Sequence, residues 1–192
     1  RKYRNFVLLL VSLFFYSWGE PKYILIMLFS SVLDYTCGQK IYRNQIKNNN
    51  KRAKLWLLVS IIVNLSMLGF FKYSNFFLEN INNVFNLSVP LLNITLPIGI
   101  SFYTFQTMSY TIDVYRKETD VQNSLIAFAT YVTLFPQLIA GPIVRYKTVA
   151  KEIDGRIETW SLFNEGVKRF IIGLGKKVLL ANSIGLLWEN IS

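Results

Sequence analysis

Long apolar runs separated by short polar or basic segments make up most of this chain. The runs cover residues 5–18, 22–39, 55–71 and 97–115, and their lengths and compositions suit helices in a bundle or a membrane. The run over 5–18 is short for a bilayer of about 30 Å, because a helix rises about 1.5 Å per residue. We therefore expect this first helix to be tilted or packed against neighbours. The pattern predicts an all-α, multi-pass transmembrane protein, with residues 1–192 forming a single membrane domain.

A further apolar run, over residues 124–141, is interrupted by Pro136 and by the pair Gly141-Pro142. Proline has no N–H donor and its ring disrupts the preceding helical turn, so this segment is either a kinked span or a re-entrant hairpin. Broken backbone at membrane depth occurs only where protein or a water-filled cavity covers it. The break therefore predicts a passage or a site beside this segment.

The segment over residues 162–180 is amphipathic, and Ser161 is its predicted N-cap. This arrangement is typical of an interfacial helix on an anionic membrane surface, and the alternative is a helix whose lysines are simply solvated. The apolar face holds Phe163, Val167, Phe170, Ile171, Leu174 and Val178, and the basic half holds Lys168, Arg169, Lys176 and Lys177.

Composition and charge agree with a membrane protein. Hydrophobic residues make up 52% of the chain, and 21 Lys and Arg residues exceed 11 Asp and Glu residues to give a net charge of +10. The basic residues gather in short segments between apolar runs, which is typical of positive-inside topology and does not favour nucleic-acid binding. By that rule the basic loop over 40–54, which has no acid, and residues 116–120 are cytoplasmic, and the protein lies in the cell membrane.

The chain has no histidine and a single cysteine, Cys37. These counts exclude an imidazole general base, imidazole metal ligands, a cysteine zinc cluster and an intramolecular disulfide. We predict no metal site in this chain.

The run over 97–115 is polar on two faces, with Thr104, Thr107 and Thr111 along one side near Ser101. Such a helix suits the inside of a bundle or the edge of a polar cavity, and hydrogen bonds between helices are the alternative role for its Ser and Thr residues. Two acids raise the same choice. Asp113 either pairs with Arg116 or faces a substrate, and Asp34 either pairs with the basic loop near Lys40 or lines a cavity.

Polar and basic residues flank the break in the fifth run. Freed amides at Gly141 together with Arg145 could bind an anionic group such as a phosphate of an activated donor, and the alternative is a purely structural Gly-Pro kink. The candidate cavity-lining or donor-binding residues are Ser101, Gln106, Asp113, Gln137, Gly141, Pro142, Arg145 and Tyr146.

Five segments spread through the chain resemble the membrane-bound O-acyltransferases, and in particular the subgroup typified by the alginate O-acetyltransferase membrane protein. The D-alanyl transferases of teichoic acid metabolism resemble the chain more weakly. The matching segments are FFYSWGEP at 14–21, GFFKYSNFF at 69–77, LPIGISFYTFQ at 96–106, IDVYR at 112–116 and FPQLIAGPIVRY at 135–146.

The resemblance implies an enzyme that takes an acyl group from a cytoplasmic thioester, usually acetyl-CoA. The acceptors would be hydroxyls of an extracytoplasmic polysaccharide or wall polymer, often with a partner protein and with no tightly bound cofactor. The family's catalytic histidine belongs to a segment later than any matched here. It follows from the resemblance that the chain is part of a longer domain, holds no catalytic residue and is inactive alone.

Two other functions fit the same pattern. A transporter or flippase subunit also uses broken spans and intramembrane acids at its binding site. A noncatalytic membrane scaffold is the third possibility.

Overall fold

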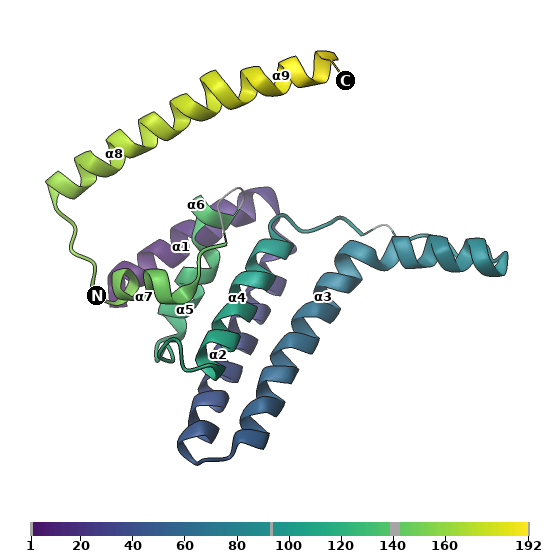
Figure 1. The fold of residues 1–192 in the computed structure, drawn as a ribbon, viewed down its shortest axis with the longest axis horizontal. Coiled ribbons are helices and arrows are strands. Elements are labelled where there is room, and N and C mark those ends of the chain that lie inside the picture. The colour runs from purple at the N-terminus through teal and green to yellow at the C-terminus, as the bar shows by residue number, and fades with distance from the viewer. Residues whose placement is uncertain (1, 93, 139–142, 192) are drawn as a thin grey trace. The chain divides into compact units, whose positions relative to one another are not determined.

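A computed structural model describes residues 2–92, 94–138 and 143–191, and it is helical, with no strand in those residues. The predicted all-α class is therefore confirmed. By their contacts the residues separate into two units, Arg1–Gly155 and Arg156–Ser192. Figure 1 shows the order of the helices along the chain.

Helices α1 (Lys2–Gly19) and α2 (Ile24–Ile46) form where the first two apolar runs are expected. A turn at residues 20–23 joins them, and the Glu20 amide still bonds to the Tyr16 carbonyl at 2.9 Å. The Tyr16 hydroxyl donates to the carbonyl of Ile98 at 3.1 Å, which ties the end of α1 to the segment before α4 (Ile100–Tyr115).

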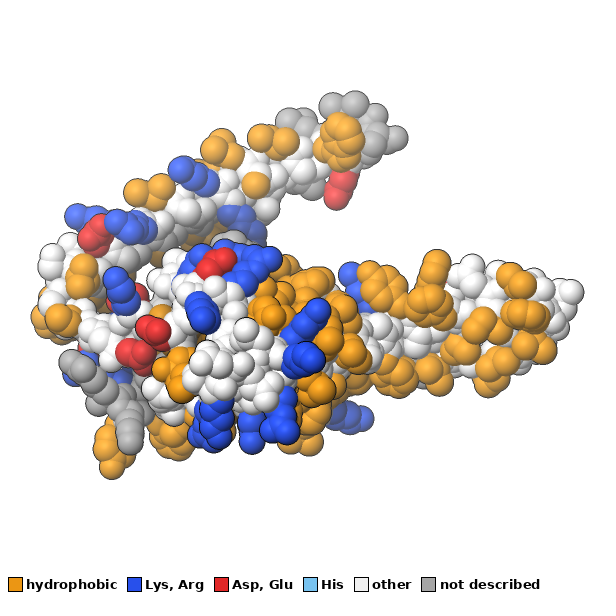
Figure 2. Space-filling view, turned by 60° about the horizontal axis from the view of Figure 1, so that its bottom comes forward, with side chains coloured by type: hydrophobic (Ala, Val, Ile, Leu, Met, Phe, Trp, Pro, Cys, Tyr) orange, Lys and Arg blue, Asp and Glu red, His pale blue; other side chains and the backbone are white. Residues whose placement is uncertain are grey.

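Helix α2 and helix α3 (Asn50–Phe85) form an antiparallel hairpin with a very short turn. Asn48 adopts a positive φ of 53°, which asparagine tolerates better than most residues, and Asn49 caps α3 by accepting from the Arg52 amide at 3.1 Å. The loop expected over 40–54 is thus wrong in its bounds, because its lysines and arginines are good helix formers and extend both helices. Figure 2 looks toward this end of the hairpin and shows Lys and Arg side chains gathered around it.

Helix α3, with 36 residues, is the one helix in the described residues that is long and apolar enough to cross a membrane. Only 17% of its most apolar stretch is buried against the rest of the protein. It continues well beyond residue 71, where the apolar run was expected to end. The C-terminal half of α3 binds the segment that follows the helix. Asn75 exchanges two hydrogen bonds with the backbone of Leu92, both at 2.9 Å. Asn82 does the same with Val89 at 2.9 and 3.0 Å.

Helix α4 packs against both α2 and α3, and α5 (Leu125–Thr133) packs against α1 and α2. Gly99 starts α4 with a φ of +75°, and a Cβ there would lie 2.9 Å from the Leu138 carbonyl oxygen, so only glycine suits the position. The short helix α6 (Phe135–Leu138) follows α5, and α7 (Tyr146–Gly155) returns to pack on α4 and α5.

The second unit consists of α8 (Trp160–Gly175), a π-helical segment (Lys176–Ala181) and α9 (Asn182–Ile191). The predicted N-cap, Ser161, is wrong. Thr159 caps α8, since its backbone is extended and its hydroxyl accepts from the Leu162 amide at 3.2 Å. The interfacial role of this amphipathic unit stays a prediction.

Candidate functional site

The break in the fifth apolar run leaves one backbone carbonyl to be satisfied by side chains. Helix α5 ends at Thr133 and α6 begins at Phe135, so the regular bonds of the last turn of α5 stop there. The carbonyl of Tyr131 instead accepts from Gln106 Nε2 of α4 at 2.9 Å and from Gln137 Nε2 of α6 at 2.7 Å. Two of the predicted site residues thus meet on one oxygen and hold the bend against α4.

We expect the two amides to substitute for each other. Gln106→Met or Gln137→Met alone leaves the Tyr131 carbonyl one donor, so each should lower the free energy of unfolding by only about 1 kcal/mol. The double substitution strands a buried acceptor and should lower it by about 3 kcal/mol. Chemical denaturation of the two single variants and the double in detergent measures this coupling. Strictly additive effects would show that the shared carbonyl does not matter.

Asp113 and Arg145 meet further along α4, about 10 Å from Gln106 at about 1.5 Å per residue. Asp113 lies on the inner face of α4 with its side chain fully buried, and Arg145 Nη2 lies 3.6 Å from its Oδ1. From the described residues neither carboxylate oxygen of Asp113 accepts a hydrogen bond, and Arg145 is the one cation there that forms an ion pair with it. The alternative pairing with Arg116 is wrong, because Arg116 follows the last residue of α4 and reaches Glu118 at 3.9 Å instead.

A second acid, Glu118, extends the charged group to the surface. Lys147 Nζ bonds to Glu118 at 2.9 Å, and Arg145 Nη1 lies 3.9 Å from the same carboxylate oxygen. The hydrogen bond from Lys147, helped by the charges of Lys147, Arg145 and Arg116, holds the pKa of Glu118 below its usual value. Glu118 is therefore ionised at neutral pH and keeps both cations close to the end of α4.

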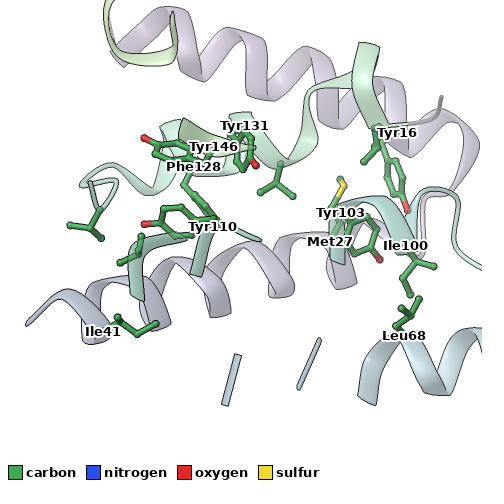
Figure 3. Packing of buried hydrophobic residues seen from close by; sticks show 14 of the residues in the cluster. Tyr16, Met27, Ile41, Leu68, Ile100, Tyr103, Tyr110, Phe128, Tyr131 and Tyr146 are labelled. Atoms are coloured by element: carbon green, nitrogen blue, oxygen red, sulfur yellow. The ribbon is translucent and has the colours of Figure 1, made fainter. Parts of the chain in front are cut away.

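Tyr146 anchors the backbone that carries Arg145. Its buried ring makes edge-on contacts with Tyr110 and Tyr131, at centroid distances of 5.1 and 5.3 Å (Figure 3). Its hydroxyl accepts from Gln122 Nε2 at 2.7 Å. Burial, aided by the charge of Asp154, raises the pKa of Tyr146 to about 12, so the phenol stays neutral. Because Tyr131 Oη also donates to the Val144 carbonyl at 2.7 Å, the chain on both sides of Arg145 is fixed.

The five predicted candidates form two groups that Tyr131 connects: Gln106 and Gln137 on its carbonyl, and Asp113 with Arg145, whose backbone Tyr146 anchors against its ring. Ser101 does not reach the Asp113–Arg145 pair, since it lies in the first turn of α4, about 18 Å along the helix from Asp113 at about 1.5 Å per residue. Gly141 and Pro142 lie outside the described residues.

Reasoning from sequence missed a polar cluster in the core between α2, α3 and α4. Asp34, expected either to pair near Lys40 or to line a cavity, is fully buried and accepts from Ser60 Oγ at 2.6 Å and from Asn64 Nδ2 at 2.8 Å. Ser60 Oγ also lies 2.9 Å from Thr111 Oγ1. The predicted pairing of Asp34 with the basic residues is wrong. Asp34 lies on the face of α2 that packs against α3 and α4, and its partners come from α3.

Spacing could have revealed this cluster. Each of the three helices contributes two polar residues four positions apart, which places both on one face. Ser30 completes the cluster by donating to Asn64 Oδ1 at 3.1 Å. The pairs are Ser30 and Asp34, Ser60 and Asn64, and Thr107 and Thr111.

Chemically, the arrangement suits binding more than proton transfer. The Arg145 side chain is 47% exposed although Asp113 beneath it is fully buried, so the guanidinium keeps donors free for an anionic group from outside. Within the described chain, no three His, Cys, Asp or Glu residues are placed to hold a metal ion.

Known proteins resemble the chain over nearly its whole length. The probable alginate O-acetylase AlgI of Pseudomonas aeruginosa is 40% identical over 193 residues, which is 98% of this chain and 37% of that protein. The corresponding protein of Pseudomonas syringae pv. tomato is 39% identical over 99% of this chain and 37% of its own length. A peptidoglycan O-acetyltransferase of Helicobacter pylori is 32% identical over 92% of this chain and 38% of its own length.

The chain therefore spans well under half the length of these relatives. No family model matches the chain. No solved structure matches it.

Proposed function

The chain is related, over nearly its whole length, to the alginate O-acetylases of the membrane-bound O-acyltransferase family, and from this relationship we propose that it forms part of a membrane O-acyltransferase. The enzyme moves an acyl group, by default acetyl, from a cytoplasmic thioester such as acetyl-CoA to hydroxyls of an extracytoplasmic polysaccharide or wall polymer. The names of the relatives, alginate O-acetylase and peptidoglycan O-acetyltransferase, support both the reaction and the class of acceptor.

The observation that carries the proposal is the position of Arg145. A half-exposed guanidinium is held over a fully buried carboxylate near the end of α4, and the backbone that carries it follows the broken apolar run. A thioester donor such as acetyl-CoA carries phosphate groups, and a planar guanidinium binds phosphate with paired hydrogen bonds. Arg145 would therefore hold the anionic part of the donor, and the Gln106 and Gln137 amides would hold the backbone that places it.

The residues of this chain are proposed to bind and position the donor and not to activate the acceptor. Acyl transfer to a hydroxyl needs a base, and imidazole is the usual base near neutral pH. Because the chain contains no histidine, that role falls to another part of the enzyme. A multi-pass topology, with residues 40–54 and 116–120 in the cytoplasm, would place the basic end of the site where the donor arrives. A partner protein would take part in delivery to the polymer.

A hybrid enzyme tests the proposal. The matched region of the Pseudomonas aeruginosa alginate O-acetylase is replaced by this chain and expressed in cells that lack the native protein. We expect alginate acetylation to return, measured as acetyl groups per uronic acid. The 192-residue chain alone, in membranes with radiolabelled acetyl-CoA and alginate, should transfer no label above mock membranes.

Two results would contradict the proposal. The first is a hybrid that accumulates in membranes at the level of the native enzyme but acetylates no polymer. The second is clear transfer by the chain alone, which would mean that it holds a complete catalytic site. Movement of an intact solute or lipid by the hybrid, without acetylation, would favour a transporter instead.

A further inference from the structure

A basic pocket lies at the turn end of the α2–α3 hairpin, away from the Asp113–Arg145 site. It has a volume of about 350 Å³ and is lined by Lys40, Arg43, Asn44, Lys47, Arg52 and Trp56. Residues from the last turns of α2 face residues from the first turns of α3 across it. No acidic side chain is among its lining residues, so the pocket attracts anions.

Carboxylates elsewhere do not neutralise this pocket. In the described residues, the ion pairs formed by Asp and Glu involve none of its four cations. Lys40 Nζ instead lies over the Trp56 ring, 5.9 Å from its centroid. A lysine held over an aromatic face keeps its charge available to a ligand, and several adjacent cations with no counter-charge repel one another until an anion joins them.

The exposed face of α2 continues from the pocket as a stripe with two different halves. Steps of three or four residues along a helix stay on one face, and the exposed positions at this spacing change from apolar to basic along α2. The apolar half consists of Leu25, Phe29 and Val32, which are 70, 55 and 45% exposed. Thr36 follows, and the basic half consists of Lys40, Arg43 and Lys47.

The neighbouring helix α3 indicates that the stripe on α2 faces a membrane. Helix α3 has the length and hydropathy of a membrane span, and Trp56 and Arg52 lie near its start. Tryptophan and basic side chains are typical of the level at which a span meets lipid headgroups. A molecule with an anionic head and long apolar tails would match the pocket with its head and the exposed apolar half of α2 with its tails.

We propose that this pocket binds the phosphate of an anionic phospholipid whose acyl chains lie along Leu25, Phe29 and Val32. Arg43 and Arg52, from the two sides of the hairpin, donate to the phosphate oxygens, and Lys40 and Lys47 add charge. The bound lipid joins the two helices at the end where only a short turn connects them. This proposal does not depend on acyl transfer and holds for the chain itself.

The test compares two variants with the same loss of charge. The pocket variant, Arg43→Gln with Arg52→Gln, removes two cations that line the pocket. The control variant, Lys51→Gln with Lys54→Gln, removes two exposed cations at the same end of the hairpin that do not line it. Dioleoylphosphatidylglycerol binding to the purified 192-residue chain in detergent is measured by native mass spectrometry. We expect the pocket variant to bind about tenfold more weakly than the parent, and the control to lose about threefold or less.

Further arms identify the source of the phosphate. Dioleoylphosphatidylcholine, which has no net charge, should bind at least about tenfold more weakly than the anionic lipid. Glycerol 3-phosphate, which has no acyl chains, should not displace the anionic lipid at equal concentration. Circular dichroism shows whether both variants keep the helical content of the parent, and a Phe29→Asn, Val32→Thr variant tests the acyl-chain half without touching the cations.

Three results would overturn the proposal. Equal weakening by the two charge-matched variants would mean that the lipid responds only to overall charge. Displacement by glycerol 3-phosphate would mean a site for a soluble phosphate compound. Unchanged lipid binding by the Phe29→Asn, Val32→Thr variant would mean that the tails do not lie along α2.

Discussion

Arg145→Met should lower the midpoint of thermal unfolding by about 6–12 °C and abolish acetylation by the hybrid enzyme. Asp113 is fully buried and accepts no hydrogen bond from the described residues, so without Arg145 its charge has no partner there. Breaking a buried ion pair from one side costs about 3–5 kcal/mol. We take about 3 kcal/mol because Arg145 is half exposed, and 1 kcal/mol corresponds to about 2–4 °C for a chain of this size. Thermal unfolding in detergent measures the loss of stability.

A second variant separates the structural role of Arg145 from its proposed contact with the donor. Arg145→Met combined with Asp113→Asn removes both charges, and we expect it to recover most of the lost stability. Acetylation should not recover, because the guanidinium that binds the donor is still missing. Arg116→Met, which removes a more exposed arginine of the same charged group, is the matched control and should keep activity. Recovery of both stability and acetylation in the double variant would show that Arg145 serves only to balance Asp113.

The helices near the site could be predicted because their apolar runs are continuous and because proline marks where the fifth run is interrupted. Pro136 lies just after the end of α5, and Gln137, Arg145 and Tyr146 follow it in sequence, which is why they were expected beside the break. Their partners on α4 could be proposed because that helix is polar on two faces. Which of those polar residues would meet the bend depends on how α4 packs against α5, and only the structure shows Gln106 and Asp113 on that side.

The predictions for the basic segment over 40–54 and for Asp34 were wrong for physical reasons. A cluster of lysines and arginines was predicted to be a loop, although these residues form helices readily and the turn takes only residues 47–49. Asp34 was expected either to pair with the basic residues near Lys40 or to line a cavity, because a charge in an apolar run needs a partner or water. Its burial depends on donors from α3, and the side of α2 that faces α3 depends on packing between helices that are distant in sequence.

Gly38→Val should destabilise the first unit as strongly as the loss of Arg145. A Cβ atom at Gly38 would lie 2.8 Å from Tyr110 Cε1 and 2.9 Å from its hydroxyl oxygen, closer than real Cβ atoms approach a neighbour. The ring cannot move aside easily, because it is fully buried, lies 4.6 Å from the Phe128 ring and accepts from the Gln122 amide at 3.1 Å. Overpacking of a rigid core costs about 1–3 kcal/mol, and valine adds two methyl groups to the clash. We therefore expect a loss of about 3 kcal/mol, or about 6–12 °C in the unfolding midpoint.

The control for this prediction is Gly69→Val in α3, where a Cβ atom would have no neighbour within 4 Å. Both substitutions place the same β-branched residue inside a helix, so their difference isolates the contact with Tyr110. We expect Gly69→Val to change the unfolding midpoint by no more than about 2 °C, since valine is slightly better than glycine in a helix. Tyr110 also packs on Tyr146, at 5.1 Å between ring centroids, so its displacement should disturb the anchor of Arg145. Gly38→Val should therefore reduce acetylation by the hybrid even below its unfolding temperature. Equal effects of the two valine substitutions would contradict the close approach of α2 to Tyr110 of α4.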